Sequence, residues 1–201
     1  MQRSVVLLTV FFLLLCGGIA SAQSDISVNG NVAIANTSTG NGVHETATKS
    51  AGLLVSFRHF SSHSGLEVNY GYTKNSQKYT DQSGASIANV QSGNHEITGA
   101  YIFRLTRGPV QPFALAGGGL LIFNPTSSAV DNADPTISRQ NRPVFLYGIG
   151  ADVRVSKGVA VRAQYRGLIY EGPDFFGANV AIHTSSAMRT DEPTIGLVYR
   201  F

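Results

Sequence analysis

The feature that most constrains the fold is a two-residue alternation of apolar and polar side chains that recurs along the chain. In its first clean occurrence, apolar positions alternate with small or polar ones; the apolar positions are Ile26, Val28, Val32 and Ile34. A period of two is that of a β-strand whose two faces meet different surroundings. The alternation predicts eight strands, at Ile26–Ile34, Ala51–His59, Leu66–Thr73, His95–Leu105, Val110–Phe123, Val144–Val155, Val159–Tyr170 and Thr194–Phe201.

The connections between these strands alternate between long and short. The long ones are Thr37–Ser50, Asn75–Asn94, Asn124–Arg142 and Glu171–Glu192. The short ones are Phe60–Gly65, Thr106–Pro109 and Ser156–Gly158. Short turns at one rim and long loops at the other are typical of transmembrane β-barrels, of which eight strands is the smallest size. A soluble, lipocalin-type barrel is the structural alternative.

Two of the three short hairpins indicate which face of the strands is apolar. The turn after Phe60 can set Arg58 opposite Glu67, and the turn at Ser156–Gly158 can set Asp152 opposite Arg162. The same registers pair Phe57 with Val68, Val55 with Tyr70, Val153 with Val161, Ile149 with Tyr165, and Tyr147 with Gly167. Both hairpins therefore have one charged face and one apolar face, which favours a barrel with lipid outside and charge inside.

Charged strand residues are expected to point inward, because an Arg or Lys on the lipid face at midplane costs about 2–4 kcal/mol. The predicted interior network consists of Arg58, Glu67, Glu96, Arg104, Asp152, Arg154, Arg162, Arg166 and Arg200. Its six arginines and three carboxylates predict a positive lumen, which would favour anions if water filled it. A plugged interior of mutually paired charges is the alternative. The strand Val110–Phe123 is small or apolar on both faces, so the pattern does not orient it.

The first 22 residues read as a secretory signal. Arg3 is followed by an apolar run, and Ala20 and Ala22 form a small-residue cleavage motif that places the mature start at Gln23. We therefore expect a cleaved segment at 1–22 and a single domain at 23–201. Cys16, the one cysteine of the chain, lies in the signal, so the mature protein is expected to have no disulfide.

Catalytic and metal sites find little support in the sequence. His183 and Ser185, with Glu192 nearby, could form a lipid-modifying esterase site, but a polar loop is the simpler interpretation. The five histidines are dispersed, and Asp131, Asn132 and Asp134 lack the regular spacing of a calcium loop. We expect no catalytic residue, metal or cofactor. The net charge of +3 is too small and scattered for nucleic-acid binding.

The C-terminal strand carries a resemblance to a known family. Ile195, Leu197, Tyr199 and Phe201 alternate up to a final aromatic residue. This pattern resembles the last strand of bacterial outer-membrane β-barrel proteins, and the whole mature chain is similar to the eight-stranded group that includes the transmembrane domain of outer-membrane protein A and the opacity-type proteins.

The resemblance implies an all-β, eight-stranded antiparallel transmembrane barrel with short periplasmic turns and long extracellular loops. It implies that the four terminal residues form the insertion signal read by the barrel-assembly machinery. Expected partners are outer-membrane lipids, lipopolysaccharide and a ligand at the loops. A structural or surface-interaction role is therefore predicted, with a small anion-permeable porin and the esterase as alternatives.

Overall fold

The computed structural model describes residues 23–36, 38–40, 43–47, 49–80, 86–130, 139–173 and 187–201. Its strands are β1 (Gln23–Ala35), β2 (Ser38–Gly40), β3 (Val43–Ala47), β4 (Ser50–Ser61), β5 (Ser64–Thr80), β6 (Ser86–Arg104), β7 (Val110–Val130), β8 (Gln140–Arg154), β9 (Val159–Glu171) and β10 (Ala187–Arg200). In this part of the chain no helix is long and apolar enough to cross a membrane.

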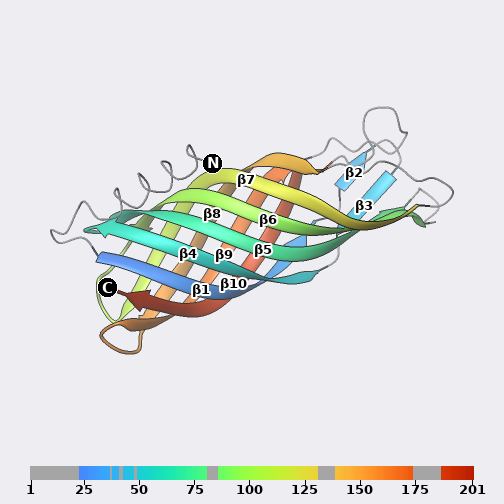
Figure 1. Ribbon diagram of the computed structural model, residues 1–201. Helices are drawn as coiled ribbons and strands as arrows, with labels where there is room; N and C mark the ends of the chain where they lie inside the picture. Colours follow the sequence, from blue (N-terminus) through green and yellow to red (C-terminus); the bar gives the residue numbers. More distant parts are fainter. Residues whose placement is uncertain are drawn as a thin grey trace, which may run out of the picture.

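Eight of the strands close into an antiparallel barrel (Figure 1). Each of β5–β9 pairs with its neighbours in sequence, and β1 pairs with both β4 and β10. The first and last strands therefore form the seam, where Asp25 lies opposite Arg200. The eight predicted strands are all confirmed, and both chain ends of the barrel lie at the rim of the short turns, where the amide of Ser24 donates to the carbonyl of Phe201 at 3.3 Å.

The predicted hairpin registers are also confirmed. Arg58 is paired with Glu67, and Asp152 with Arg162. Tyr147 lies opposite Gly167, and a Cβ atom added to Gly167 would lie 2.2 Å from Cζ of the Tyr147 ring. The glycine therefore leaves the space that the tyrosine ring occupies.

The strands are longer than predicted at the rim of the long connections. β5 continues to Thr80, β6 begins at Ser86, and β7 continues to Val130. β3 of the β2–β3 hairpin pairs with the end of β5. The interpretation of Asn75–Asn94 as a loop is therefore wrong over most of its length. This ladder lies beyond the apolar band, where no face needs apolar residues, so a search for alternation misses it. We call the part of the β5–β6–β7 ladder that lies beyond the apolar band, together with the β2–β3 hairpin, the strand extension (Figure 1).

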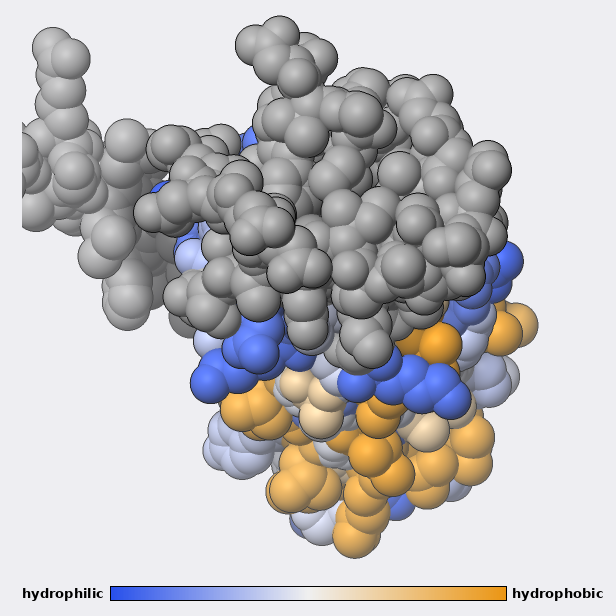
Figure 2. Space-filling model, turned by 90° about the vertical axis from the view of Figure 1, so that its right-hand side faces the viewer, coloured by the Kyte–Doolittle hydropathy of each residue, from blue (hydrophilic) through white to orange (hydrophobic). Residues whose placement is uncertain are grey.

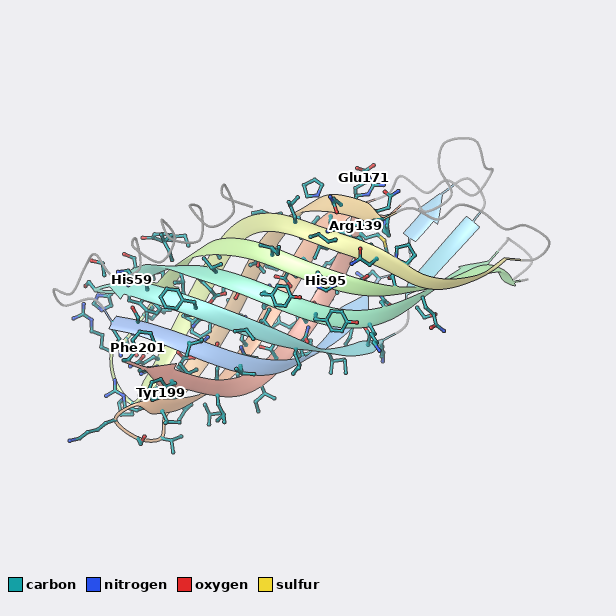
Figure 3. The ribbon with its side chains drawn as sticks, viewed as in Figure 1. His59, His95, Arg139, Glu171, Tyr199 and Phe201 are labelled. Atoms are coloured by element: carbon teal, nitrogen blue, oxygen red, sulfur yellow. The ribbon has the colours of Figure 1, made fainter. Side chains whose placement is uncertain are left out.

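The outer surface of the barrel is apolar. Exposed side chains include Leu66, Ile149 and Leu197, each more than 60% exposed. Figure 2 shows hydrophilic residues gathered along one border of this hydrophobic band. At the other end of the barrel, His59, Tyr199 and Phe201 lie close to the rim of the short turns (Figure 3).

The structure orients β7, which the sequence pattern left open. Its inward residues are Gln111, Phe113, Leu115, Leu121 and Phe123, all buried, whereas Leu120 is exposed on the outside. The four apolar ones cluster with side chains such as Ile102 and Leu146 and form an apolar wall inside the barrel. The interior is thus polar on one side and apolar on the other.

Candidate functional site

The short-turn half of the barrel interior holds a dense cluster of ion pairs. Arg162 on β9 donates from Nε to Asp152 Oδ1 at 2.7 Å and from Nη2 to Asp25 Oδ1 at 3.2 Å. Arg200 reaches Asp152 Oδ2 at 3.2 Å, and Arg104 lies 3.6 Å from Asp25 Oδ2. Strands β1, β6, β8, β9 and β10 each supply one member, so the cluster crosses the lumen.

A fourth arginine, Arg58, extends this cluster toward β4 and β5. Arg58 is ion-paired with Glu67, and its Nη2 donates to Gln164 Oε1 at 3.0 Å. Its guanidinium group lies 4.2 Å from the centre of the Phe113 ring. Asn69 also donates to Glu67, at 2.8 Å. The arginine therefore joins the polar wall to the apolar wall through a cation–π contact.

The other half of the interior holds a separate cluster around Arg166. Its Nη1 donates to Glu192 Oε2 at 3.1 Å, and its Nη2 is ion-paired with Glu96. Thr98 donates its hydroxyl to Glu96 at 2.7 Å. Arg166 and Arg58 are completely buried, so their charges depend on these carboxylates.

The described part of the interior is balanced in charge. Its buried charged residues are Arg58, Arg104, Arg162, Arg166 and Arg200 against Asp25, Glu67, Glu96, Asp152 and Glu192. The predicted positive lumen is therefore wrong, because Asp25 and Glu192 were not counted. Asp25 lies one residue before the predicted first strand, and Glu192 lies in β10 where a loop end was predicted.

Arg154 is the one predicted network residue that does not enter the interior. It is exposed, although it has the same strand parity as buried Asp152. β8 ends at Arg154, so its side chain extends past the rim of the short turns into solvent.

A small cavity lies at the mouth of the barrel on the side of the long connections. It measures about 40 Å³. Thr73, Glu96 and Glu192 line one part of it, and Leu121 and Phe123 another. This volume holds a few water molecules and is far below the roughly 300 Å³ of a small-molecule site.

The sequence matches the family described as outer membrane protein beta-barrel domain over residues 8–201, nearly the whole chain. The chain belongs to this family. The outer-membrane barrel therefore resides in the bacterial outer membrane, with its short turns toward the periplasm and its long connections outside.

Solved structures of other barrels agree with the fold. Neisserial surface protein A is 19% identical with a TM-score of 0.59, covering 90% of this chain and 100% of that one. Ail of Yersinia pestis, in complex with the heparin analogue sucrose octasulfate, is 15% identical with a TM-score of 0.54, covering 90% and 100%. OprG of Pseudomonas aeruginosa is 14% identical with a TM-score of 0.58, covering 90% and 96%. Comparison with curated proteins gives no match.

In this outer-membrane barrel, the four residues of the proposed insertion signal form one outward row. Ile195, Leu197, Tyr199 and Phe201 are all exposed on the lipid side of β10 or just after it. Their role in recognition by the assembly machinery stays a prediction. An outward row of this kind is accessible to another protein only before lipid surrounds the barrel.

The remaining predicted residues fall into two groups. Ala20, Ala22, His183, Ser185 and the loop residues Asp131, Asn132 and Asp134 lie outside the described residues. Gln23, the predicted mature start, is the first residue of β1, and its Oε1 accepts from Arg104 at 3.0 Å. Among the described residues, no group of three or more His, Cys, Asp or Glu could hold a metal ion.

Proposed function

We propose that this outer-membrane barrel is a non-conducting, non-catalytic surface protein whose extracellular strand extension binds a partner outside the cell. The observation that carries the proposal is the filled and charge-balanced interior. Five arginines and five carboxylates neutralise one another across the lumen, and the largest of these side chains are fully buried. An interior of this kind favours a barrel that acts as a structural scaffold rather than as a channel for ions or solutes.

The strand extension supplies the binding surface in this proposal. β5 and β6 pair from the short turn at Ser64 to Thr80, well past the outward apolar residues Tyr70 and Ile97. β7 continues beside β6 as far as Val130. A hydrogen-bonded ladder fixes the backbone of the paired strands, which lowers the entropy lost on binding.

The two alternatives have less support. An anion-permeable porin needs an excess of positive charge along the lumen, and the buried charges are balanced. An esterase needs a carboxylate to orient its histidine, and the carboxylate of Glu192 lies 3.1 Å from Arg166 inside the barrel.

Purified protein inserted into a planar lipid bilayer is expected to give no ion-conducting steps. The reason is that the buried ion pairs of the Arg162 cluster link β1, β6, β8, β9 and β10 across the short-turn half of the lumen. A general porin inserted into the same bilayer serves as the positive control. Reproducible steps from this protein, of either ion selectivity, would contradict the non-conducting part of the proposal.

The binding part can be tested separately by shortening the strand extension. Residues 77–90 would be replaced by Asn-Gly, a two-residue turn that joins the paired residues Ser76 and Gln91. Bacteria that display the shortened protein should lose adhesion to host cells or immobilised glycans that wild type supports. Equal adhesion by both, at equal surface amounts, would contradict a role for the extension.

A further inference from the structure

A second hollow lies on the outside of the barrel, above the apolar band. It measures about 370 Å³, roughly nine times the volume of the mouth cavity. Its lining residues are Lys49, Ser50, Tyr72, Lys74, Asn75, Ser76, Gln91, Ser92 and Gly93. We call it the outer groove.

The groove arises where the partner of β5 changes. The ladder of β5 with β4 ends at the pair Gly52 and Thr73, and its ladder with β3 begins at Ala47 and Gln77. Lys74, Asn75 and Ser76 lie between the two ladders. The chain that leads from β3 into β4 passes the same point and brings Lys49 to the groove.

An aromatic ring forms one wall of the groove. Tyr72 lies 5.0 Å from the His95 ring, centre to centre. A Cβ atom added to Gly93 would lie 3.2 Å from the Tyr72 hydroxyl, so the glycine leaves room for the ring on β6. Tyr70 and Ile97, the next outward residues on β5 and β6, belong to the apolar band. The groove therefore sits at the boundary between hydrocarbon and polar headgroups.

The described lining of the groove is positively charged. Lys49 and Lys74 are both exposed, and neither has an ion pair or hydrogen bond with a described residue. The described lining residues include no carboxylate. Two ammonium groups over hydroxyl and amide side chains, at headgroup depth on the extracellular side, are suited to an anionic lipid headgroup.

We propose that the outer groove binds a phosphate group of lipopolysaccharide in the outer leaflet. The two lysines neutralise the phosphate, and the Tyr72 ring packs against the sugar that carries it. The acyl chains then lie along the apolar wall formed by β5 and β6. This assigns a position on the barrel to a lipid partner and is independent of whether the strand extension binds anything else.

The test compares wild-type protein with the double variant Lys49→Gln/Lys74→Gln in detergent. Binding of lipid A that carries both phosphates would be titrated. Loss of each lysine is expected to weaken binding about 5-fold, and loss of the pair roughly 25-fold. Wild type should also bind dephosphorylated lipid A more weakly by a similar factor.

Two further variants serve as controls. Lys157→Gln makes the same charge change in a short turn at the opposite rim and should leave binding unchanged. Gly93→Leu fills the groove without changing its charge and should weaken binding as the lysine changes do. All variants must keep the heat-dependent gel mobility of a closed barrel.

Several outcomes would overturn the proposal. One is equal affinity of the double variant and wild type, and another is an equal loss for Lys157→Gln. Equal binding of dephosphorylated lipid A would show that the groove does not recognise the phosphate. Displacement of lipid A by an equal concentration of inorganic phosphate would show that the groove does not recognise the lipid. None of these outcomes bears on the conductance or adhesion experiments.

Discussion

Replacement of Arg162 by methionine should lower the free energy of unfolding by about 3–5 kcal/mol. Arg162 is fully buried and donates to both Asp152 and Asp25, so its loss leaves two carboxylates in the lumen without their main cation. Unfolding in urea, from lipid vesicles, would be followed by circular dichroism or by the unheated gel mobility. Tryptophan fluorescence cannot serve, since the chain has no tryptophan.

Arg154→Met is the matched control for this experiment. Arg154 is exposed at the end of β8, and its replacement should change the free energy of unfolding by less than about 0.5 kcal/mol. Equal effects of the two substitutions would mean that the interior ion pairs contribute nothing specific to stability.

Replacement of Ile149 by arginine should destabilise the membrane-inserted barrel by about 2–4 kcal/mol. Ile149 points outward from β8 and is 65% exposed, with Phe145 and Val153 on the same face on either side. It therefore lies within the apolar band, where a guanidinium group must give up its hydration. The measurement is the urea midpoint of barrels folded into vesicles.

The same substitution at Val155 provides the comparison. Val155 also points outward but lies just past the end of β8, where the cost for an arginine falls to about 0–1 kcal/mol. If Ile149→Arg and Val155→Arg had the same effect, or if neither had any, the outer face of β8 would not be in contact with lipid.

The sequence predicted best where short turns fix the register. The turn between Phe60 and Ser64 leaves few ways to pair β4 with β5, and charge matching of Arg58 with Glu67 selects among them. The same argument worked for Asp152 and Arg162. Once one pair is known, the two-residue period assigns every other side chain of the hairpin to a face.

The sequence failed at the ends of strands. Asp25 and Glu192 lie outside the apolar alternation that defined β1 and β10, so two of the five interior carboxylates were missed. Arg154 obeys the alternation but not the burial, because the barrel has already ended there. The carboxylates were missed because the predicted strands ended where the apolar residues of the alternation ended, although both strands continue past those points.

The strand extension and the outer groove were not predictable from the pattern. The extension depends on backbone pairing of polar segments, for which the apolar period gives no signal. The groove depends on the exchange of β4 for β3 beside β5, which is a property of the pairing and not of any one segment.

The seam between β1 and β10 brings together buried charges from the two ends of the barrel domain. Asp25 on the first strand and Arg200 on the last lie opposite each other, and both take part in the cluster around Arg162 and Asp152. A slip of one residue at the seam would turn Asp25 toward lipid and Ile26 toward the lumen. The cluster can therefore be completed only when the two ends of the sequence meet in the observed register, so the ion pairs that fill the lumen also favour one way of closing the barrel.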